Sequence, residues 1–325
     1  MDERYQVNIF WVQDYRFIVL HCTALVFIGL SFICAGFVII TSFKNKGKLN
    51  FFVSWSKCER FVIYTATCDI LLHIVHCTDH IHMLATRDHV HPIELCEFYS
   101  FILYEFTFAQ SSLVFTIALN AFLLIKFRIK MNYGARDWRL ISLVFGMPFI
   151  ICIFLVIFKQ FGPTGTYCGI VGERVVTFIS TLPVLLILTA NIILYALTWK
   201  HIKMEGRKMT VSSRISNSPG KRSARAAKNM SLFVAAYLLQ WWALPVHGLW
   251  YFVDNTPFVV LELLAIFTNM GGILNGMVYL IIKKSRVIQV NSVCLQNDGP
   301  ERDKTLAYTQ SQCDKTLASD QLQCS

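Results

Sequence analysis

Seven long apolar runs constrain this chain more than any other feature of its sequence. Each run is long enough to cross a bilayer as a helix, which takes about 20 mostly apolar residues. Because 55% of the 325 residues are hydrophobic, a soluble globular domain is not expected. The sequence therefore predicts an all-α fold, a seven-transmembrane helix bundle. The predicted spans are residues 17–42, 60–85, 97–127, 139–158, 175–199, 229–252 and 257–282.

The distribution of basic residues predicts how the bundle is oriented. Of the 30 Lys and Arg residues, 25 lie in or beside the first, third and fifth connections and the C-terminal tail. Positive charge collects on the cytoplasmic side, so the N-terminus is expected outside and the C-terminus in the cytoplasm. The formal net charge of +10 then reflects topology and contact with anionic inner-leaflet lipid, not nucleic acid. We expect a multi-pass protein of the plasma membrane.

The segments outside the spans are mostly polar. The connection from His201 to Lys228 carries eight Lys and Arg residues and shows no hydrophobic periodicity, so a flexible basic segment is expected there. The tail contains an eleven-residue tandem repeat, DKTLAYTQSQC followed by DKTLASDQLQC. The predicted organisation is a short extracellular N-terminus at 1–16, the bundle at 17–282, a membrane-surface helix at 283–294 with Cys294 as a palmitoylation candidate, and a disordered cytoplasmic tail at 295–325.

Polar residues interrupt several apolar runs, and each costs several kcal/mol in hydrocarbon unless it finds a partner. Asp69 lies near the middle of the second span, so its carboxylate needs a hydrogen-bond donor, a bound cation or a proton. It is either a structural acceptor between helices or part of an ion- or proton-coupled switch. In the last span, Asn275 and Tyr279 lie one turn apart on one helical face. That span is expected to face the interior of the bundle.

Histidines concentrate in and after the second span, where six of the nine lie between residues 73 and 91. His73, His76 and His80 fall on one face of the predicted helix. They are solvated or core side chains, a proton sensor, or ligands of a metal ion. Their spacing matches no closed four-ligand motif, so no metal or cofactor is predicted.

Cysteine placement predicts one disulfide. Of eleven cysteines, only Cys96 and Cys168 fall in predicted external positions. In an oxidising compartment these two pair most economically. Such a bond would pin the external loop from Lys159 to Arg174 across the mouth of the bundle.

The remaining spans differ in their expected positions. The third is long and polar along one side and is expected at the centre, whereas the fourth is more uniformly apolar and is expected at the periphery, with a kink at Pro148. In the sixth, Pro245 removes a backbone hydrogen bond and predicts a bend. Trp241 and Trp242 lie too deep in this span for an interfacial aromatic belt.

Over residues 17–294 the chain resembles the G-protein-coupled receptor superfamily. The features that carry the resemblance are seven spans with an external N-terminus, Cys96 and Cys168 placed like the family's disulfide, Asp69 placed like its second-helix acid, and the run Asn275-Gly276-Met277-Val278-Tyr279, similar to the family's N-P-x-x-Y. The run NMGGILNGMVY also looks like the seventh helix of the slime-mould cyclic-AMP-receptor-like group.

The chain departs from the rhodopsin-like pattern at several positions. Gly276 stands where that class has proline, and its D-R-Y triplet is absent from the corresponding residues Asn120-Ala121-Phe122. Trp242 precedes Pro245 by three residues where the family tryptophan precedes its proline by two. The seventh span contains no lysine, which excludes a retinal Schiff base.

The resemblance implies a receptor, not an enzyme, that passes an extracellular ligand signal to a cytoplasmic heterotrimeric G protein. A ligand would favour one of two helix packings, and loops 126–139 and 199–228 would meet the G protein. The implied activation relay is Asp69, Trp242, Pro245, Asn275 and Tyr279. The candidate ligand contacts are His73, His76, His80, Glu105, Trp242, His247 and Glu262.

Two other classes fit a seven-span chain. A membrane transporter or a proton or ion channel would use Asp69, Glu105 and Glu262, although no inverted repeat is visible. A seven-span zinc-dependent hydrolase would need histidines and an acid near the cytoplasmic side, whereas the histidines here lie toward the outside. Flux in reconstituted vesicles and elemental analysis for metal would separate these classes from a receptor.

Overall fold

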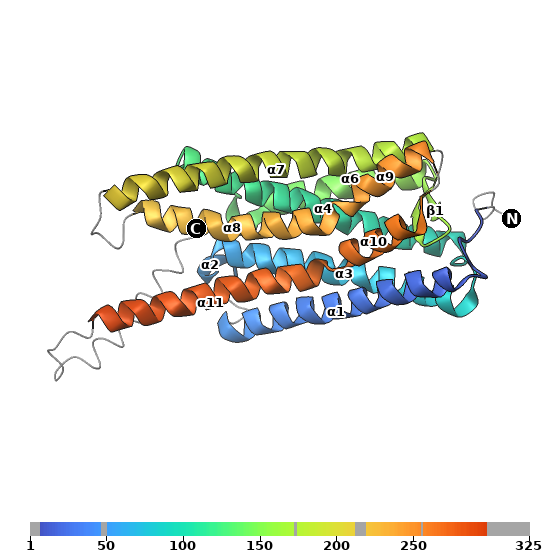
Figure 1. The fold of residues 1–325 in the computed structure, drawn as a ribbon, viewed down its shortest axis with the longest axis horizontal. Coiled ribbons are helices and arrows are strands. Elements are labelled where there is room, and N and C mark those ends of the chain that lie inside the picture. The colour runs from blue at the N-terminus through green and yellow to red at the C-terminus, as the bar shows by residue number, and fades with distance from the viewer. Residues whose placement is uncertain (1–6, 47–50, 172–173, 212–218, 255, 298–325) are drawn as a thin grey trace.

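The structure, a computed structural model, describes residues 7–46, 51–171, 174–211, 219–254 and 256–297. Its long helices lie side by side along one common direction (Figure 1). Among the described residues, six helices are long and apolar enough to cross a membrane. A seventh span results if two helices that meet at a bend of 42° count as one. The architecture is that of a helical, multi-pass membrane protein.

Two short strands interrupt an otherwise helical order of elements. The elements are α1 (Tyr15–Lys46), α2 (Phe51–Ser54), α3 (Lys57–Thr86), α4 (Ile93–Lys126), η2 (Ala135–Asp137), α5 (Trp138–Ile141), η3 (Ser142–Gly146), α6 (Met147–Ile157), β1 (Phe161–Pro163), β2 (Cys168–Ile170), α7 (Arg174–Val211), α8 (Pro219–Trp241), α9 (Ala243–Val253), α10 (Phe258–Asn269) and α11 (Gly271–Asn297).

Proline and glycine explain where the apolar runs break. Pro245 has no N–H to offer the Trp241 carbonyl four residues earlier, and the break between α8 and α9 follows Trp241. Pro148 likewise follows a π-helical turn, η3, that joins α5 to α6. The break between α10 and α11 at Met270 precedes Gly271 and Gly272, which favour the helix less than other residues.

Two segments differ from the sequence-based expectation. The segment 201–228, expected to be flexible, is helical over 201–211 and 219–228, because Lys, Arg, Ala and Met continue a helix readily even without an apolar face. Residues 283–294, including Cys294, continue α11 without a break instead of starting a separate surface helix. Most of the expected tail, from residue 298 onward, lies outside the described residues, as does 212–218.

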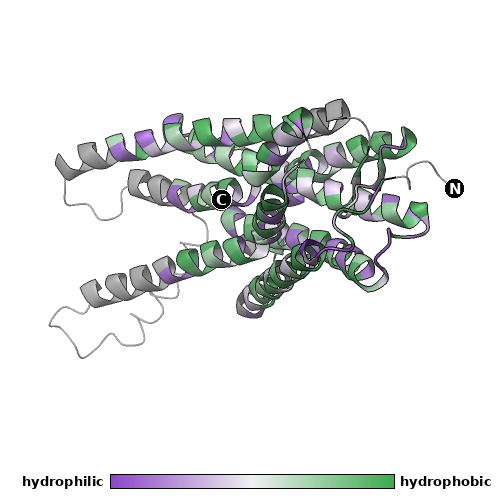
Figure 2. Ribbon diagram, turned by 45° about the vertical axis from the view of Figure 1, so that its right-hand side comes forward, coloured by the Kyte–Doolittle hydropathy of each residue, from purple (hydrophilic) through white to green (hydrophobic). Residues whose placement is uncertain are grey.

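The burial of the helices places α4 at the centre. It packs against α3, α6, α7 and α8. In its most apolar stretch 67% of the residues are buried, against 22% for the fourth span. Apolar residues run along most of the length of the outer helices (Figure 2), and exposed side chains such as Ile33, Ile40 and Ile157 suit contact with lipid.

One end of the bundle, here called the hairpin end, is covered by the antiparallel pair of β1 and β2. A disulfide between Cys96 and Cys168 ties this hairpin to α4, as the sequence predicts, with an S–S distance of 2.11 Å. The Cys168 amide also donates to Oδ2 of Asp79 in α3 at 2.7 Å. The N-terminal segment reaches the same hairpin, because the Phe10 amide donates to the Gly165 carbonyl at 3.0 Å.

The disulfide can be tested directly. Peptide mapping of the intact protein under non-reducing conditions should recover the Cys96 and Cys168 peptides as one linked species, which separates on reduction. Cys152, which is fully buried in α6, serves as an internal control that should be recovered unlinked. Recovery of Cys96 and Cys168 as free thiols would contradict the fold at the hairpin end.

Candidate functional site

Two adjoining chambers lie inside the hairpin end of the bundle. The inner chamber has a volume of about 70 Å³ and the outer one about 370 Å³. Both are lined by Tyr104, Thr107, Thr166, Tyr167, Leu244 and Leu261, so they adjoin each other between α4, the hairpin, α9 and α10. Concave sites of this kind, mostly apolar with a few polar groups, are where proteins bind small molecules.

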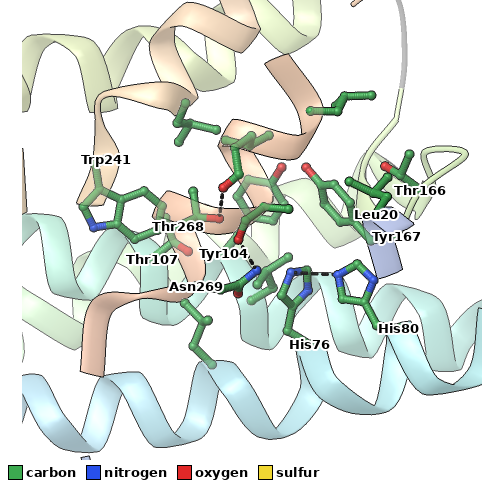
Figure 3. Close-up of a pocket in the computed structure, with 16 residues that line it drawn as sticks. Leu20, His76, His80, Tyr104, Thr107, Thr166, Tyr167, Trp241, Thr268 and Asn269 are labelled. Carbon is green, nitrogen blue, oxygen red and sulfur yellow. Dashed lines mark hydrogen bonds between the residues drawn. The ribbon is translucent and has the colours of Figure 1, made fainter. Parts of the chain in front are cut away.

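Figure 3 shows the residues that line the inner chamber. His76 and His80 of α3 lie on one side of it, and Thr268 and Asn269 from the last turn of α10 lie on another. Trp241, at the end of α8, lines it too and is only 3% exposed. The chamber therefore touches both helix breaks, the one after Trp241 and the one after Asn269.

The outer chamber extends toward the N-terminal segment. Val7, Phe10 and Trp11 line it together with hairpin residues such as Pro163 and Thr164. Burial raises the pKa of the Tyr167 phenol in the hairpin, so this lining group stays uncharged at neutral pH.

Three buried histidines form a hydrogen-bonded chain beside the inner chamber. Nδ1 of His21 lies 2.6 Å from Nδ1 of His80, and Nε2 of His80 lies 3.2 Å from Nε2 of His76. At the two ends of this histidine chain, Nε2 of His21 and Nδ1 of His76 have no hydrogen-bond partner within the described part of the protein. A neutral imidazole carries one N–H, so each contact needs a donor on one side and an acceptor on the other.

The tautomers of the three rings are therefore coupled. If His21 donates to His80, then His80 donates to His76, whose free Nδ1 carries a hydrogen. If the direction is reversed, the Nδ1 of His76 is an acceptor and the Nε2 of His21 carries the hydrogen. The three histidines thus have two neutral arrangements: in one, Nδ1 of His76 is a hydrogen-bond donor, and in the other it is an acceptor.

A polar network begins at the floor of the inner chamber. Nε1 of Trp241 and Nε2 of Gln240 both donate to Oε1 of Gln110 at 3.3 Å. Gln240 also donates to the Thr268 carbonyl at 3.2 Å, one of the carbonyls left unpaired where α10 ends. The network thereby joins α4 and α8 to both helix breaks that border the chamber.

The network ends at Asp69, which is fully buried. Its Oδ1 accepts from Nε2 of Gln110 at 2.7 Å, and its Oδ2 accepts from Nδ2 of Asn275 at 2.8 Å. Both carboxylate oxygens are thus satisfied by amides from α4 and α11. Since a buried carboxylate without partners is costly, these two bonds couple the position of α11 to that of α4.

Glycines allow α11 to approach this network closely. A side chain at Gly271 would overlap the Gln240 amide and lie 2.6 Å from Oδ1 of Asp69. The Gly272 amide donates to Oγ of Ser31 in α1 at 2.6 Å, and a side chain there would overlap the Ser31 carbonyl. At residue 272 a backbone atom stands in the way, so glycine is needed there, whereas a side chain at residue 271 would require Gln240 and Asp69 to shift.

A second buried polar group lies at the end of the bundle opposite the hairpin. Nε and Nη2 of Arg60 donate to Asp137 at 2.6 and 3.2 Å, and Nη1 donates to the Trp55 carbonyl at 2.6 Å. The Tyr64 hydroxyl donates to the same carboxylate at 3.0 Å. Burial and the nearby Asp137 carboxylate raise the pKa of the Tyr133 phenol. This ion pair ties α3 to the connection before α5.

A capping box positions the arginine. The Glu59 amide donates to Oγ of Ser56 at 3.4 Å, and the Glu59 carboxylate accepts from the Ser56 amide at 2.9 Å. This pairing fixes where α3 begins and therefore which way Arg60 points.

The structure brings together only some of the predicted ligand contacts. His76 and His80 line the inner chamber and His247 lines the outer one. The other four predicted contacts line neither chamber: His73, Glu105, Trp242 and Glu262. Three of them have buried atoms without a hydrogen-bond partner among the residues that the structure describes: both ring nitrogens of His73, Oε2 of Glu105 and Oε2 of Glu262.

The predicted relay residues are also divided. Asp69 and Asn275 bond directly, and Pro245 is buried in α9 just after the helix break. Tyr279 lies one turn beyond Asn275 and packs against apolar core residues. Trp242 packs against Phe267 with ring centroids 5.0 Å apart, while its neighbour Trp241 contacts the network.

Several residues of the site were not singled out by sequence reasoning. The most important are Gln110, Gln240 and His21, each a polar side chain inside an apolar run. That interruption is the signal by which they could have been found, because polar groups in a span require partners. Asp137 gave no such signal, since it lies in a polar connection.

Among the described residues, no three His, Cys, Asp or Glu side chains are placed to hold a metal ion. Nor does comparison with known proteins supply a family: no protein-family model matches the chain, and no curated protein matches it significantly.

Proposed function

We propose that this chain is a plasma-membrane receptor that transmits an extracellular ligand signal to a cytoplasmic heterotrimeric G protein. In this proposal the N-terminus and the hairpin end face outward, in agreement with the placement of basic residues at the opposite end. The ligand occupies the chambers, and the ion-paired end of the bundle faces the G protein.

One observation carries the proposal: the network from the chamber floor to Asp69. Trp241 and Thr268 line the chamber, and through Gln240 and Gln110 they connect to Asp69 at the centre of the bundle. A ligand that binds one arrangement of this floor more tightly shifts the balance between two helix packings by its difference in affinity. The helix breaks at Trp242 and Met270 are the natural points at which the outer segments move relative to the inner ones.

The proposal is tested by a ligand screen read through G-protein activation in cells that express the full chain. Compounds that activate signalling in these cells, and not in cells without the chain, support it. A chain that reaches the cell surface yet activates no G protein with any compound, and shows no basal activity, counts against it.

Exchange of the two partners at the network's centre gives a sharper test. Asp69→Asn should reduce G-protein activation while leaving surface expression largely intact. Both Gln110 and Asn275 donate an N–H to Asp69, so the N–H₂ group of the substituted side chain would face another donor at one of these two contacts. An unsatisfied buried donor costs about 1–3 kcal/mol. The double variant Asp69→Asn/Asn275→Asp restores one donor and one acceptor to each contact, so it should recover much of the lost signalling. Retention of the single variant inside the cell would instead assign Asp69 a purely structural role.

The histidine chain favours one alternative, a proton channel. Hydrogen-bonded imidazoles at 2.6 and 3.2 Å can pass a proton from His76 to His21 by exchanging tautomers. A proton flux into vesicles that contain the purified chain, abolished in the variant His80→Phe, would support this function over the receptor. Flux equal to that of empty vesicles would exclude it.

A further inference from the structure

We infer that the two chambers bind an uncharged, mainly apolar small molecule that carries a hydroxyl or carbonyl group, which His76 meets. The inference rests on the receptor proposed above, because it names the chemical class of that receptor's ligand.

The described walls of the two chambers offer no carboxylate, ammonium or guanidinium group to a charged ligand. Among the described residues that line either chamber, none is Asp, Glu, Lys or Arg. The nearest acids of the same helices, Glu105 and Glu262, belong to neither lining, and Asp79 is engaged by the Cys168 amide. An ammonium or carboxylate ligand would lose its hydration here without a counter-charge, a cost that only pairing offsets.

The walls and size of the cavity suit an apolar molecule. Leucines from five elements line the inner chamber, including Leu20, Leu72 and Leu103, and aromatic rings such as Phe108 and Tyr251 line the outer one. The outer volume of about 370 Å³ lies within the range of small-molecule sites, which is roughly 300–1,000 Å³. Burial of apolar surface against such walls is the main source of affinity.

We assign His76 as the hydrogen-bond partner of the ligand's polar group. This side chain lines the inner chamber and is only 9% exposed, and none of the described residues is a hydrogen-bond partner of its Nδ1. Because the chain to His80 and His21 has two neutral arrangements, Nδ1 donates in one and accepts in the other. Either a carbonyl or a hydroxyl on the ligand can therefore be matched without placing a charge in the cavity.

The test compares three compounds that share one carbon skeleton and differ in charge: 4-phenylbutan-1-ol, 4-phenylbutanoate and 4-phenylbutylamine. Each is titrated into the purified full chain in neutral detergent micelles at pH 7, and the midpoint of thermal unfolding is followed by tryptophan fluorescence. A ligand that binds only the folded state raises the midpoint with its concentration. We expect the alcohol to bind at least tenfold more tightly than either ion.

Variants show whether the shift comes from the cavity. Leu244 lines both chambers, so the larger side chain in Leu244→Trp should abolish the effect of the alcohol. If this variant fails to fold, Leu261→Trp is used in its place, because Leu261 also lines both chambers. Leu249→Trp is the matched control in the same helix, because Leu249 is 46% exposed on the outer face. His76→Phe should weaken binding of the alcohol by about fivefold, the worth of one hydrogen bond, and leave binding of butylbenzene, which lacks the hydroxyl, unchanged.

The outcomes separate this inference from the receptor proposal. Binding of either ion as tightly as the alcohol, no shift with the alcohol, or a shift that persists in Leu244→Trp would overturn the inference. Binding of the alcohol to the cavity without G-protein activation would support it and count against the receptor. Both readouts use the same full chain, but the binding assay contains no G protein.

Discussion

Replacement of Asp137 by alanine is expected to lower the free energy of unfolding by about 3–5 kcal/mol, the usual cost of removing one partner from a buried ion pair. Arg60 is 8% exposed and Asp137 4%, so the guanidinium would stay buried without its carboxylate. The Tyr64 hydroxyl would lose its acceptor as well. In purified protein in detergent, the midpoint of thermal unfolding should fall on the order of 10 °C.

A double variant distinguishes the ion pair from simple loss of packing. Arg60→Met/Asp137→Leu removes both charges and keeps apolar volume, so it should be less destabilised than Asp137→Ala or Arg60→Met alone. Arg139→Ala is the matched control: this arginine lies in the same segment but is exposed, and its loss should change stability by no more than about 0.5 kcal/mol. Equal melting of Asp137→Ala and the parent would show that the pair does not form.

Substitution of Gly272 by alanine is the second large effect that we expect. The added methyl group would overlap the backbone carbonyl of Ser31, which cannot turn aside as a flexible side chain would. It would also push the Gly272 amide away from Oγ of Ser31, now at 2.6 Å. Overpacking of this kind costs about 1–3 kcal/mol or more. The expected result is a lower melting midpoint and reduced surface expression, measured by thermal unfolding and by surface labelling.

Gly276→Ala is the control for this substitution, since it makes the same change one turn further along α11. The nearest atom to a methyl group at residue 276 is Cβ of Cys34 at 3.4 Å, an ordinary contact distance. Alanine favours the helix over glycine by about 1 kcal/mol, so this variant should be at least as stable as the parent. If both variants lose stability equally, close approach of α1 is not the reason for glycine at 272.

The sequence alone was sufficient for the helical elements and for the disulfide. Apolar length limits where a helix can cross a bilayer, so all seven predicted runs correspond to helices, although the sixth and seventh contain breaks. Cys96 and Cys168 could be paired because only two cysteines fall at the predicted outer side. The sequence-based expectation of a flexible segment at 201–228 was wrong for 201–211 and 219–228, which continue the neighbouring helices.

For the site, the sequence indicated which groups needed partners but not which partners they have. Asp69 in an apolar run must be satisfied, yet its donor Gln110 is 41 residues away and its donor Asn275 is 206 away. His21 likewise contacts a partner in another helix, His80, which is 59 residues away in the sequence. Helical spacing within one span carries no information on how two spans are rotated and shifted against each other.

Only the tertiary structure decided the choice between Trp241 and Trp242. Counting residues along a regular helix cannot assign their directions, because the break after Trp241 changes the rotation of everything that follows. The structure places Trp241 against Gln110 and Trp242 against Phe267. The chambers too could not be predicted from the sequence, because residues of six or more separate elements line them. Local sequence determines apolar length and the points at which a helix breaks, whereas a cavity and its hydrogen bonds depend on packing between segments far apart in the chain.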